Sequence, residues 1–331
     1  MKKRITALII SALLIIISMT SCSSSNKFTV NISGAEISEG IYTYYYDYVS
    51  SNYEKLKIDN SQKALTDKTI ELIKEYVAIN TMAESLGLSL PYTLKAQAAS
   101  ETDNRWDLFG EYYSSIGLTK QDLNKVMTNK ALKSALLDYY YGEDSKKKPT
   151  STQTLKTAFT QKYVGINVIA ASLTTTDTLG NTVVLDSSEL ENIRTMFRNM
   201  RDRLNGGSDI DSVYSDYITT LDLIGTQSLE TYLISESSTG YGEDFFPGIS
   251  ALEYNKALVF EYEDTVYLAY RVDISGDDLG YFVTYKSEIL EDLCLSKLEK
   301  KIAEEAEKYE LIKEHSNITR KIRETVDKKH K

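Results

Sequence analysis

The start of the chain alternates apolar and polar residues and then changes to helical spacing. From Phe28 to Ile37 the alternation breaks at Ser33-Gly34, which predicts a small hairpin. Ser38 suits the N-cap of the following helix, because its hydroxyl accepts a hydrogen bond from a free backbone N–H. Tyrosine crowds this helix, which carries Tyr42, Tyr44, Tyr45, Tyr46 and Tyr48.

Three further helices are predicted before residue 150. One runs from Ser61 to Leu86 and ends at Gly87, with Ile70, Ile73 and Val77 as its apolar stripe. The next opens at Pro91 and runs towards Gly117, and its apolar face is assigned to Trp106, Leu108, Phe109 and Tyr112. The third begins at Thr119, with Asp122 three residues later as in a capping box, and ends at Gly142.

The pattern changes after a short helix at residues 154–161. A β-rich run at residues 163–173 precedes a turn at Gly180-Asn181, and a helix then extends from Asp186 to Gly206 and continues over residues 208–217. Two more β-like runs follow at residues 256–264 and 265–274. Helices beside strands of this kind predict an α+β fold with an antiparallel sheet. Residues 238–248 contain Gly-x-Gly, but without the context of a phosphate-binding loop they are interpreted as a loop over the sheet.

A long final helix is predicted from residue 285 to residue 315. Its apolar stripe consists of residues at intervals of three and four: Leu295, Leu298, Ile302, Ala306, Tyr309 and Ile312. Such a face must pack on another element, and the helical N-terminal region is the expected partner.

Residues 1–21 have the features of a secretory signal peptide. A basic start is followed by an apolar run from Ile5 to Ile17, which is shorter than the roughly 20 residues of a membrane-spanning helix. The segment ends in Met19-Thr20-Ser21-Cys22, which resembles a bacterial lipobox. The resemblance implies that Cys22 is lipidated, that residues 22–27 are a tether, and that the protein is anchored to the cell membrane on its extracytoplasmic face. After cleavage only Cys294 remains, so an internal disulfide is excluded.

Charge and histidine content exclude several classes of function. A net charge of −10 and a pI near 5.0 argue against nucleic acid as a partner. The two histidines, His315 and His330, lie close to the C-terminus, which argues against a histidine-based metal or nucleophile site, and we expect no metal and no cofactor. The basic run at residues 146–148 is interpreted as a solvated linker, and the basic tail at residues 320–331 as a segment able to touch anionic lipid.

The order of these parts resembles the PrsA/SurA family of extracytoplasmic foldases. The resemblance rests on the lipobox, on "VNISGAEIS" leading into a helix, on "LGLSL" and "GLTKQDLNKVM", and on a β-starting middle region followed by a C-terminal helix. It implies a helical chaperone domain at residues 28–158, a parvulin-like domain at residues 159–280, and a C-terminal helix with a basic tail at residues 281–331 that packs on the first domain.

The resemblance also implies that the parvulin-like domain is degenerate. Val168 and Leu268 stand where the family keeps its two histidines, and Tyr217 stands where it keeps Cys or Asp. Valine and leucine have no hydrogen-bonding group, so no catalytic residue is assigned. The implied function is a membrane-anchored chaperone for unfolded secreted polypeptides without prolyl isomerase catalysis. Two alternatives stay open: an active peptidyl-prolyl isomerase and a non-catalytic scaffold for a specific partner.

Two interpretations of the tyrosine-rich helix also stay open. On a helix, residues 42, 45, 46 and 49 share one face and residues 44 and 48 another, so the five tyrosines cannot all be buried on one side. Half of them are expected to pack in the core. The others are candidates for a client-binding surface, because tyrosine combines an apolar ring with a polar hydroxyl that tolerates water.

Overall fold

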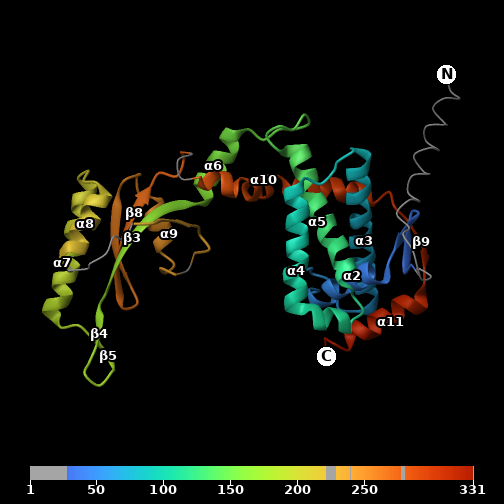
Figure 1. Cartoon of the computed structure of the whole chain (residues 1–331), viewed down its shortest axis with the longest axis horizontal. Coiled ribbons are helices and arrows are strands. Elements are labelled where there is room, and N and C mark those ends of the chain that lie inside the picture. The colour runs from blue at the N-terminus through green and yellow to red at the C-terminus, as the bar shows by residue number, and fades with distance from the viewer. Residues whose placement is uncertain (1–27, 221–228, 239, 277–279, 331) are drawn as a thin grey trace. The chain divides into compact units, whose positions relative to one another are not determined.

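The computed structural model describes residues 28–220, 229–238, 240–276 and 280–330, and confirms an α+β fold (Figure 1). The chain divides into two compact units: the residues up to Tyr140 together with those from Ser296 onward, and Tyr141–Leu295 between them. Helix α10, Tyr281–Ala306, passes from the second unit into the first. The predicted signal peptide, Cys22 and tether lie outside the described residues. The assignment of the units to a chaperone domain and a parvulin-like domain stays a prediction.

The first unit contains a small antiparallel sheet built from both ends of the chain. Strands β1, Val30–Ile32, and β2, Ala35–Ile37, form the predicted hairpin, and β9, Leu311–Glu314, pairs with the other edge of β1. The hairpin turn needs left-handed backbone at Ser33 and Gly34, whose φ angles are 48° and 100°. Gly34 N–H also donates to Asn31 Oδ1 at 2.8 Å, which fixes the turn.

Helices make up most of the rest of the first unit, and several of them pack with this sheet in one apolar cluster. They are α2 (Glu39–Ser51), α3 (Gln62–Ser85), α4 (Tyr92–Ser115), α5 (Lys120–Tyr141) and α11 (Ser316–Asp327), with the last part of α10. Side chains from α2, α3, α5 and α11 meet in the core. The predicted cap at Ser38 is confirmed, and Ser61 caps α3 in the same way, since each hydroxyl accepts from a backbone N–H of the first turn.

One carboxylate joins the starts of α2 and α5. Asp122 accepts from the Thr119 hydroxyl at 2.7 Å at the start of α5. It also accepts at 3.0 Å from the hydroxyl of Ser38, the N-cap residue of α2. Gly40 makes room for it, because a Cβ there would lie 2.2 Å from Asp122 Oδ2. Contacts between two distant segments, residues 38–40 and 119–122, therefore fix how these helices begin.

The second unit is a four-stranded antiparallel sheet with helices on both faces. Its strands run in the order β6 (Thr231–Ile234), β3 (Val164–Ser172), β8 (Thr265–Val272), β7 (Ala257–Tyr262), and a separate hairpin joins β4 (Thr174–Thr176) to β5 (Thr182–Val184). Helices α7 (Ser187–Asn205) and α8 (Ile210–Thr220) cover one face, and α9 (Phe245–Ser250) packs on the other, as Figure 1 shows. Helix α6, Thr152–Lys162, precedes β3.

The prediction of one helix from residue 285 to residue 315 is wrong. The helix ends at Ala306, and residues 311–314 form β9 instead. Leu298, Ile302 and Ala306 are buried as expected, but Ile312 is 65% exposed. Ile322 on α11 instead belongs to the apolar core of the first unit. The free edge of β1 supplies backbone hydrogen-bonding groups that a strand satisfies and a helix does not.

Two short elements of the second unit were also missed. The segment interpreted as a loop at residues 238–248 contains the start of α9, and strand β6 carries no clear alternation in its four residues. Both are too short to reveal a period, so the neighbouring sheet decides their conformation.

The two isoleucines near the C-terminus provide a test of this arrangement. We expect Ile322→Ala to lower the free energy of unfolding by about 2–4 kcal/mol, because it opens a cavity in the core of the first unit. Ile312→Ala, the matched control at an exposed position, should change it by less than about 0.5 kcal/mol. Urea unfolding followed by circular dichroism measures both. Equal losses would contradict the assignment of β9 and α11.

Candidate functional site

The structure does not bring the three predicted parvulin-like positions together. Val168 and Leu268 lie on neighbouring strands, but Val168 pairs with Ala269, and Leu268 pairs with Ile169. Side chains alternate along a strand, so Val168 packs towards α9, whereas Leu268 joins Tyr217 in the cluster under α7 and α8. The degenerate triplet therefore forms no common site in this arrangement.

The side chains of Tyr217 and Asn167, near the middle of the sheet, donate to backbone carbonyls, and Asn167 also donates to a threonine hydroxyl. The Tyr217 hydroxyl donates to Ala170 O at 3.1 Å, and burial raises its pKa. The Asn167 amide, which is 6% exposed and which the sequence did not single out, donates to Glu230 O at 2.9 Å and to Thr231 Oγ1 at 3.1 Å. These contacts stabilise strand pairing and present no acid/base pair.

Two of the five predicted client-binding tyrosines lie in the core. Tyr42 and Tyr46 are 0% exposed and stack at 6.4 Å. The Tyr46 hydroxyl donates to Asp327 Oδ1 at 3.0 Å, and Arg323 donates to the Tyr42 hydroxyl at 3.3 Å, so both tyrosines attach α11 to α2. Burial is also the main cause that raises their pKa values. A client-binding role for Tyr42 and Tyr46 is therefore contradicted by their burial.

The remaining three tyrosines of α2 differ in exposure. Tyr44 and Tyr45 are half-buried against the core with their rings edge to face at 5.4 Å. Lys130 donates to the Tyr44 hydroxyl at 3.1 Å. Only Tyr48 among the five has a large exposed fraction, at 40%. The tyrosine-rich helix thus contributes one ring to the surface.

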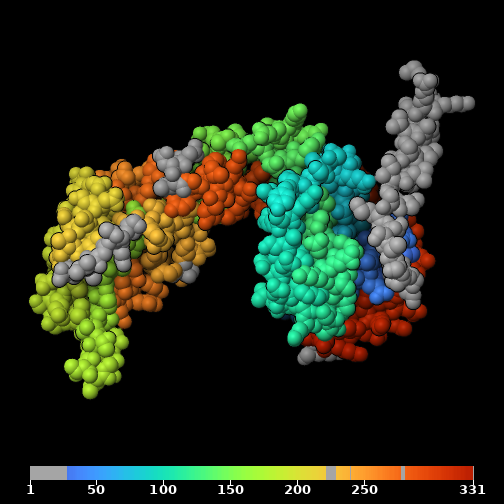
Figure 2. All heavy atoms as spheres, viewed as in Figure 1, coloured from blue at the N-terminus to red at the C-terminus, as the bar shows by residue number. Residues whose placement is uncertain are grey.

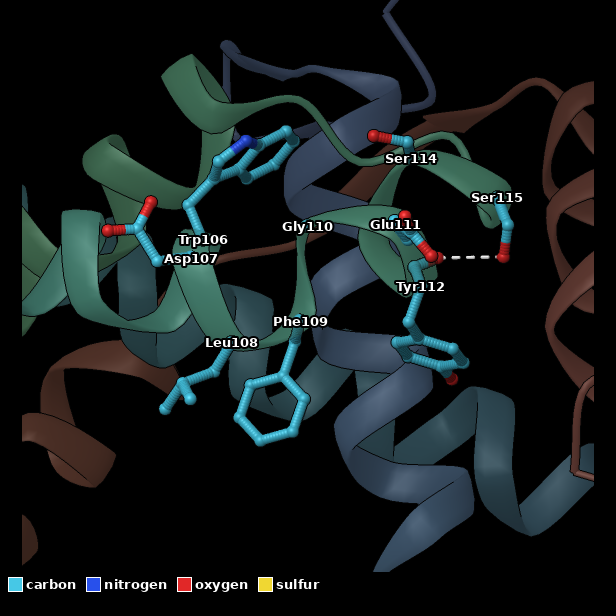
Figure 3. Close-up of a pocket in the computed structure, with 9 residues that line it drawn as sticks. All are labelled: Trp106, Asp107, Leu108, Phe109, Gly110, Glu111, Tyr112, Ser114 and Ser115. Atoms are coloured by element: carbon cyan, nitrogen blue, oxygen red, sulfur yellow. Dashed lines mark hydrogen bonds between the residues drawn. The ribbon is translucent and has the colours of Figure 1, made fainter.

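The most apolar exposed surface of a described helix in the first unit lies on α4. Leu108 is 75% exposed and Phe109 is 50% exposed, and both line an open hollow of about 1060 Å³ together with Trp106 and Tyr112. Figure 3 shows Leu108, Phe109 and Tyr112 projecting to one side of α4 and Trp106 to the other. In the space-filling view α4 forms an outer side of this unit (Figure 2). Large apolar groups exposed side by side mark an interaction surface more often than isolated ones do.

The sequence analysis placed these residues on a packing face, and that assignment is wrong for Leu108 and Phe109. Successive residues of a helix point about 100° apart, so residues 106, 108, 109 and 112 cannot all face one core. The buried face of α4 is instead formed by Ala98, Thr102 and Tyr113. The width of the apolar arc in the sequence indicates that part of it lies at the surface.

Two contacts shape the hollow. Gly110 lets the Trp106 indole lie flat against the helix, because a Cβ there would stand 3.1 Å from Trp106 Nε1. On the other side, Tyr112 donates a hydrogen bond to Asp47, and its hydroxyl lies 2.9 Å from His330 Nε2. Burial, followed by the hydrogen bond to Asp47, raises the Tyr112 pKa. The C-terminal segment therefore helps to hold one wall of the hollow in place.

The rim of the hollow is acidic. Asp107 and Glu111 line it and form no ion pair with a described residue, whereas Asp103, one turn earlier, pairs with Lys120 at 2.9 Å. Arg105 is neutralised by Glu101 at 2.5 Å. The hollow thus combines exposed apolar side chains with unpaired negative charge.

Metal ions and membrane spans have no counterpart in the described ranges. Within residues 28–220, 229–238, 240–276 and 280–330, no three His, Cys, Asp or Glu side chains gather as metal ligands. Among the helices of those same ranges, none is both long and apolar enough to cross a membrane.

Comparison with known proteins finds similar solved structures, which are PrsA foldases, but no similar sequence among family models or curated proteins. No family model matches the chain, and neither does any curated protein. Foldase protein PrsA from Streptococcus pneumoniae is 10% identical with a TM-score of 0.32, over 92% of this chain and 94% of that chain. The Lactococcus lactis foldase protein PrsA is 14% identical with a TM-score of 0.36, over 90% and 99%, and PrsA from Bacillus subtilis is 10% identical with a TM-score of 0.25, over 93% and 94%. The chain is therefore similar to PrsA foldases over most of its length, at identities and TM-scores that carry no argument about its activity.

Proposed function

We propose that this protein is a membrane-anchored extracytoplasmic chaperone that binds unfolded secreted polypeptides without catalysing prolyl isomerisation. The observation that carries the proposal is the hollow on α4, where Leu108 and Phe109 are exposed beside an acidic rim. An unfolded chain offers apolar side chains without a fixed order, and an open apolar surface accepts them without a shaped pocket. The unpaired carboxylates of Asp107 and Glu111 favour client segments that also contain Lys or Arg.

The composition of the sheet supports the absence of catalysis. Proton transfer and polar stabilisation of a twisted amide need side chains with donors or acceptors near the substrate. The three positions singled out by the resemblance hold valine, tyrosine and leucine, and the tyrosine hydroxyl is bound to a backbone carbonyl. A scaffold for one specific partner is the second candidate, because a fixed partner would use the same exposed surface.

The client surface is tested by removing its apolar groups. We expect the double substitution Leu108→Ser with Phe109→Ser to reduce suppression of client aggregation several-fold, because the surface loses both of its most exposed apolar side chains. Light scattering of two unrelated unfolding proteins measures this. The matched control is Leu179→Ser with Val283→Ser, which removes two exposed apolar side chains, 84% and 68% exposed, from the second unit.

Three outcomes decide between the candidates. Loss for the α4 variant alone supports the chaperone proposal, and equal loss in both variants would point to a non-specific apolar effect. If the wild-type protein suppresses aggregation of neither client, the chaperone proposal fails and the scaffold for a specific partner replaces it. Fluorescence of Trp106, the single tryptophan of the chain, gives an independent measure of occupancy of the hollow.

Catalysis is tested on a short prolyl peptide. Uncatalysed exchange takes tens to hundreds of seconds over a barrier of about 18–20 kcal/mol, so even weak catalysis is visible above it. We expect no acceleration, because Val168 and Leu268 carry no hydrogen-bonding group and the Tyr217 hydroxyl is bound to Ala170 O. A turnover proportional to protein concentration would establish the alternative, an active prolyl isomerase.

Membrane anchoring is tested at Cys22. We expect Cys22→Ala to leave an unprocessed precursor or to release the protein, because the acyl chains attach through the thiol. Fractionation of cells with and without the substitution measures it. A variant processed and retained like the wild type would exclude the anchor.

A further inference from the structure

Helix α11 has one face in the core and an opposite face rich in unpaired cations. Thr319, Ile322 and Val326 are buried against the first unit. The exposed residues on the other side include Arg320, Lys321 and one carboxylate, Glu324, and the exposed Lys328 and Lys329 directly follow the helix, so cations outnumber the carboxylate four to one. The ion pairs recorded at this end of the chain, Arg323 with Glu314 and His330 with Asp47, leave those four cations without a partner among the described residues. A cluster of unpaired cations is unusual on a protein whose net charge is −10, and it indicates an anionic partner.

The first described residue lies directly beside the start of α11. The Phe28 and His315 rings pack edge to face, with 4.6 Å between their centres. Lys313 Nζ lies 5.3 Å from the centre of the Phe28 ring. His315 N–H also donates to Thr29 O at 2.9 Å. His315 immediately precedes α11, so the beginning of the folded chain and the beginning of the basic helix share one place.

The tether that leads to this place is short. Phe28 follows Cys22 by six residues, and six residues span at most about 20 Å when fully extended. Helix α11 has 12 residues and is therefore about 18 Å long. A lipid on Cys22 thus keeps the start of α11 within about one helix length of the bilayer surface.

We propose that the outer face of α11 is a binding surface for anionic phospholipid headgroups, which it contacts when Cys22 is anchored. This inference rests on the anchor in the proposed function. Attraction between Lys or Arg and a charged bilayer is screened within about 10 Å at moderate salt, so a surface of this kind acts only if it is held close. The short tether supplies that condition, and it selects a membrane over acidic proteins or nucleic acids as the partner.

Vesicle binding tests the proposal without the lipid anchor. The probe protein is the chain from Ser23 onward, which differs from the predicted mature protein only by the acylated cysteine. We expect it to co-sediment with vesicles of phosphatidylcholine containing phosphatidylglycerol, and not with phosphatidylcholine alone. Binding should fall as the salt concentration rises from about 0.05 to about 0.5 M.

Charge reversal locates the surface. The triple variant Arg320→Glu, Lys321→Glu, Lys328→Glu should lower the partition coefficient about fivefold for each cation that touches the membrane. The matched control reverses Lys146, Lys147 and Lys148 to Glu, an equal change of net charge in the second unit, and should bind like the wild type. Circular dichroism checks that α11 stays folded, since all three substituted side chains are exposed.

The results separate this inference from the proposed function. Equal loss in both triple variants, or equal binding to neutral and anionic vesicles, would overturn the surface on α11. Both variants should keep full suppression of client aggregation, because their charges lie outside the α4 hollow. A failure in the vesicle experiment therefore leaves the chaperone proposal standing, and a failure of the Cys22 experiment does not depend on these charges.

Discussion

The pairing of β9 with β1 is the interaction on which the first unit depends. Val30 and Ile32 of β1 are fully buried, and the strand between β2 and β9 has both edges satisfied. A hairpin of two three-residue strands is marginal alone in water, so the third strand supplies much of its stability. Further bonds extend the seam, since Ser33 N–H donates to Glu310 O and His315 N–H to Thr29 O, each at 2.9 Å. The chain closes a loop of nearly its full length here, and the entropic cost of closure rises only slowly with length.

The closure also positions α11. The helix starts directly after β9, and its buried face joins the core formed by Tyr42 and Tyr46. The hydroxyl of Tyr46 bonds Asp327 near the end of α11, while the hydroxyl of Tyr42 accepts from Arg323 one turn earlier. Two of the five tyrosines, Tyr42 and Tyr46, therefore bind the C-terminal helix, with apolar rings in the core and hydroxyls directed to α11. Apart from Tyr48, this helix contributes little to the exposed surface.

Local signals predicted the parts of the fold that depend on neighbouring residues. The hairpin turn, the cap at Ser38 and the start of the helix at Asp186 follow from short-range chemistry, and the structure has them. The strand at residues 311–314 could not be found in this way, because its partner is about 280 residues earlier and its four residues fit the helical period equally well. The opposite faces of Val168 and Leu268 likewise depend on strand register, which a one-residue shift inverts. The exposure of Leu108 and Phe109 on α4 has a different cause: the apolar residues of this helix spread over an arc wider than the face that packs on the core, which is formed by Ala98, Thr102 and Tyr113.

The apolar side chains of Val168 and Leu268 have a physical consequence for the second unit. Two buried imidazoles would each need hydrogen-bonding partners, and a buried polar group without one costs about 1–3 kcal/mol. Leu268 is instead fully buried among Phe197, Val266 and Tyr217, and Val168 packs with the cluster under α9. Full burial of such a side chain contributes about 1.5–3 kcal/mol. Val168 and Leu268 therefore stabilise the sheet on its two faces, and neither side chain carries a hydrogen-bond donor or acceptor. In the proposed chaperone, client binding is assigned to the surface of the first unit.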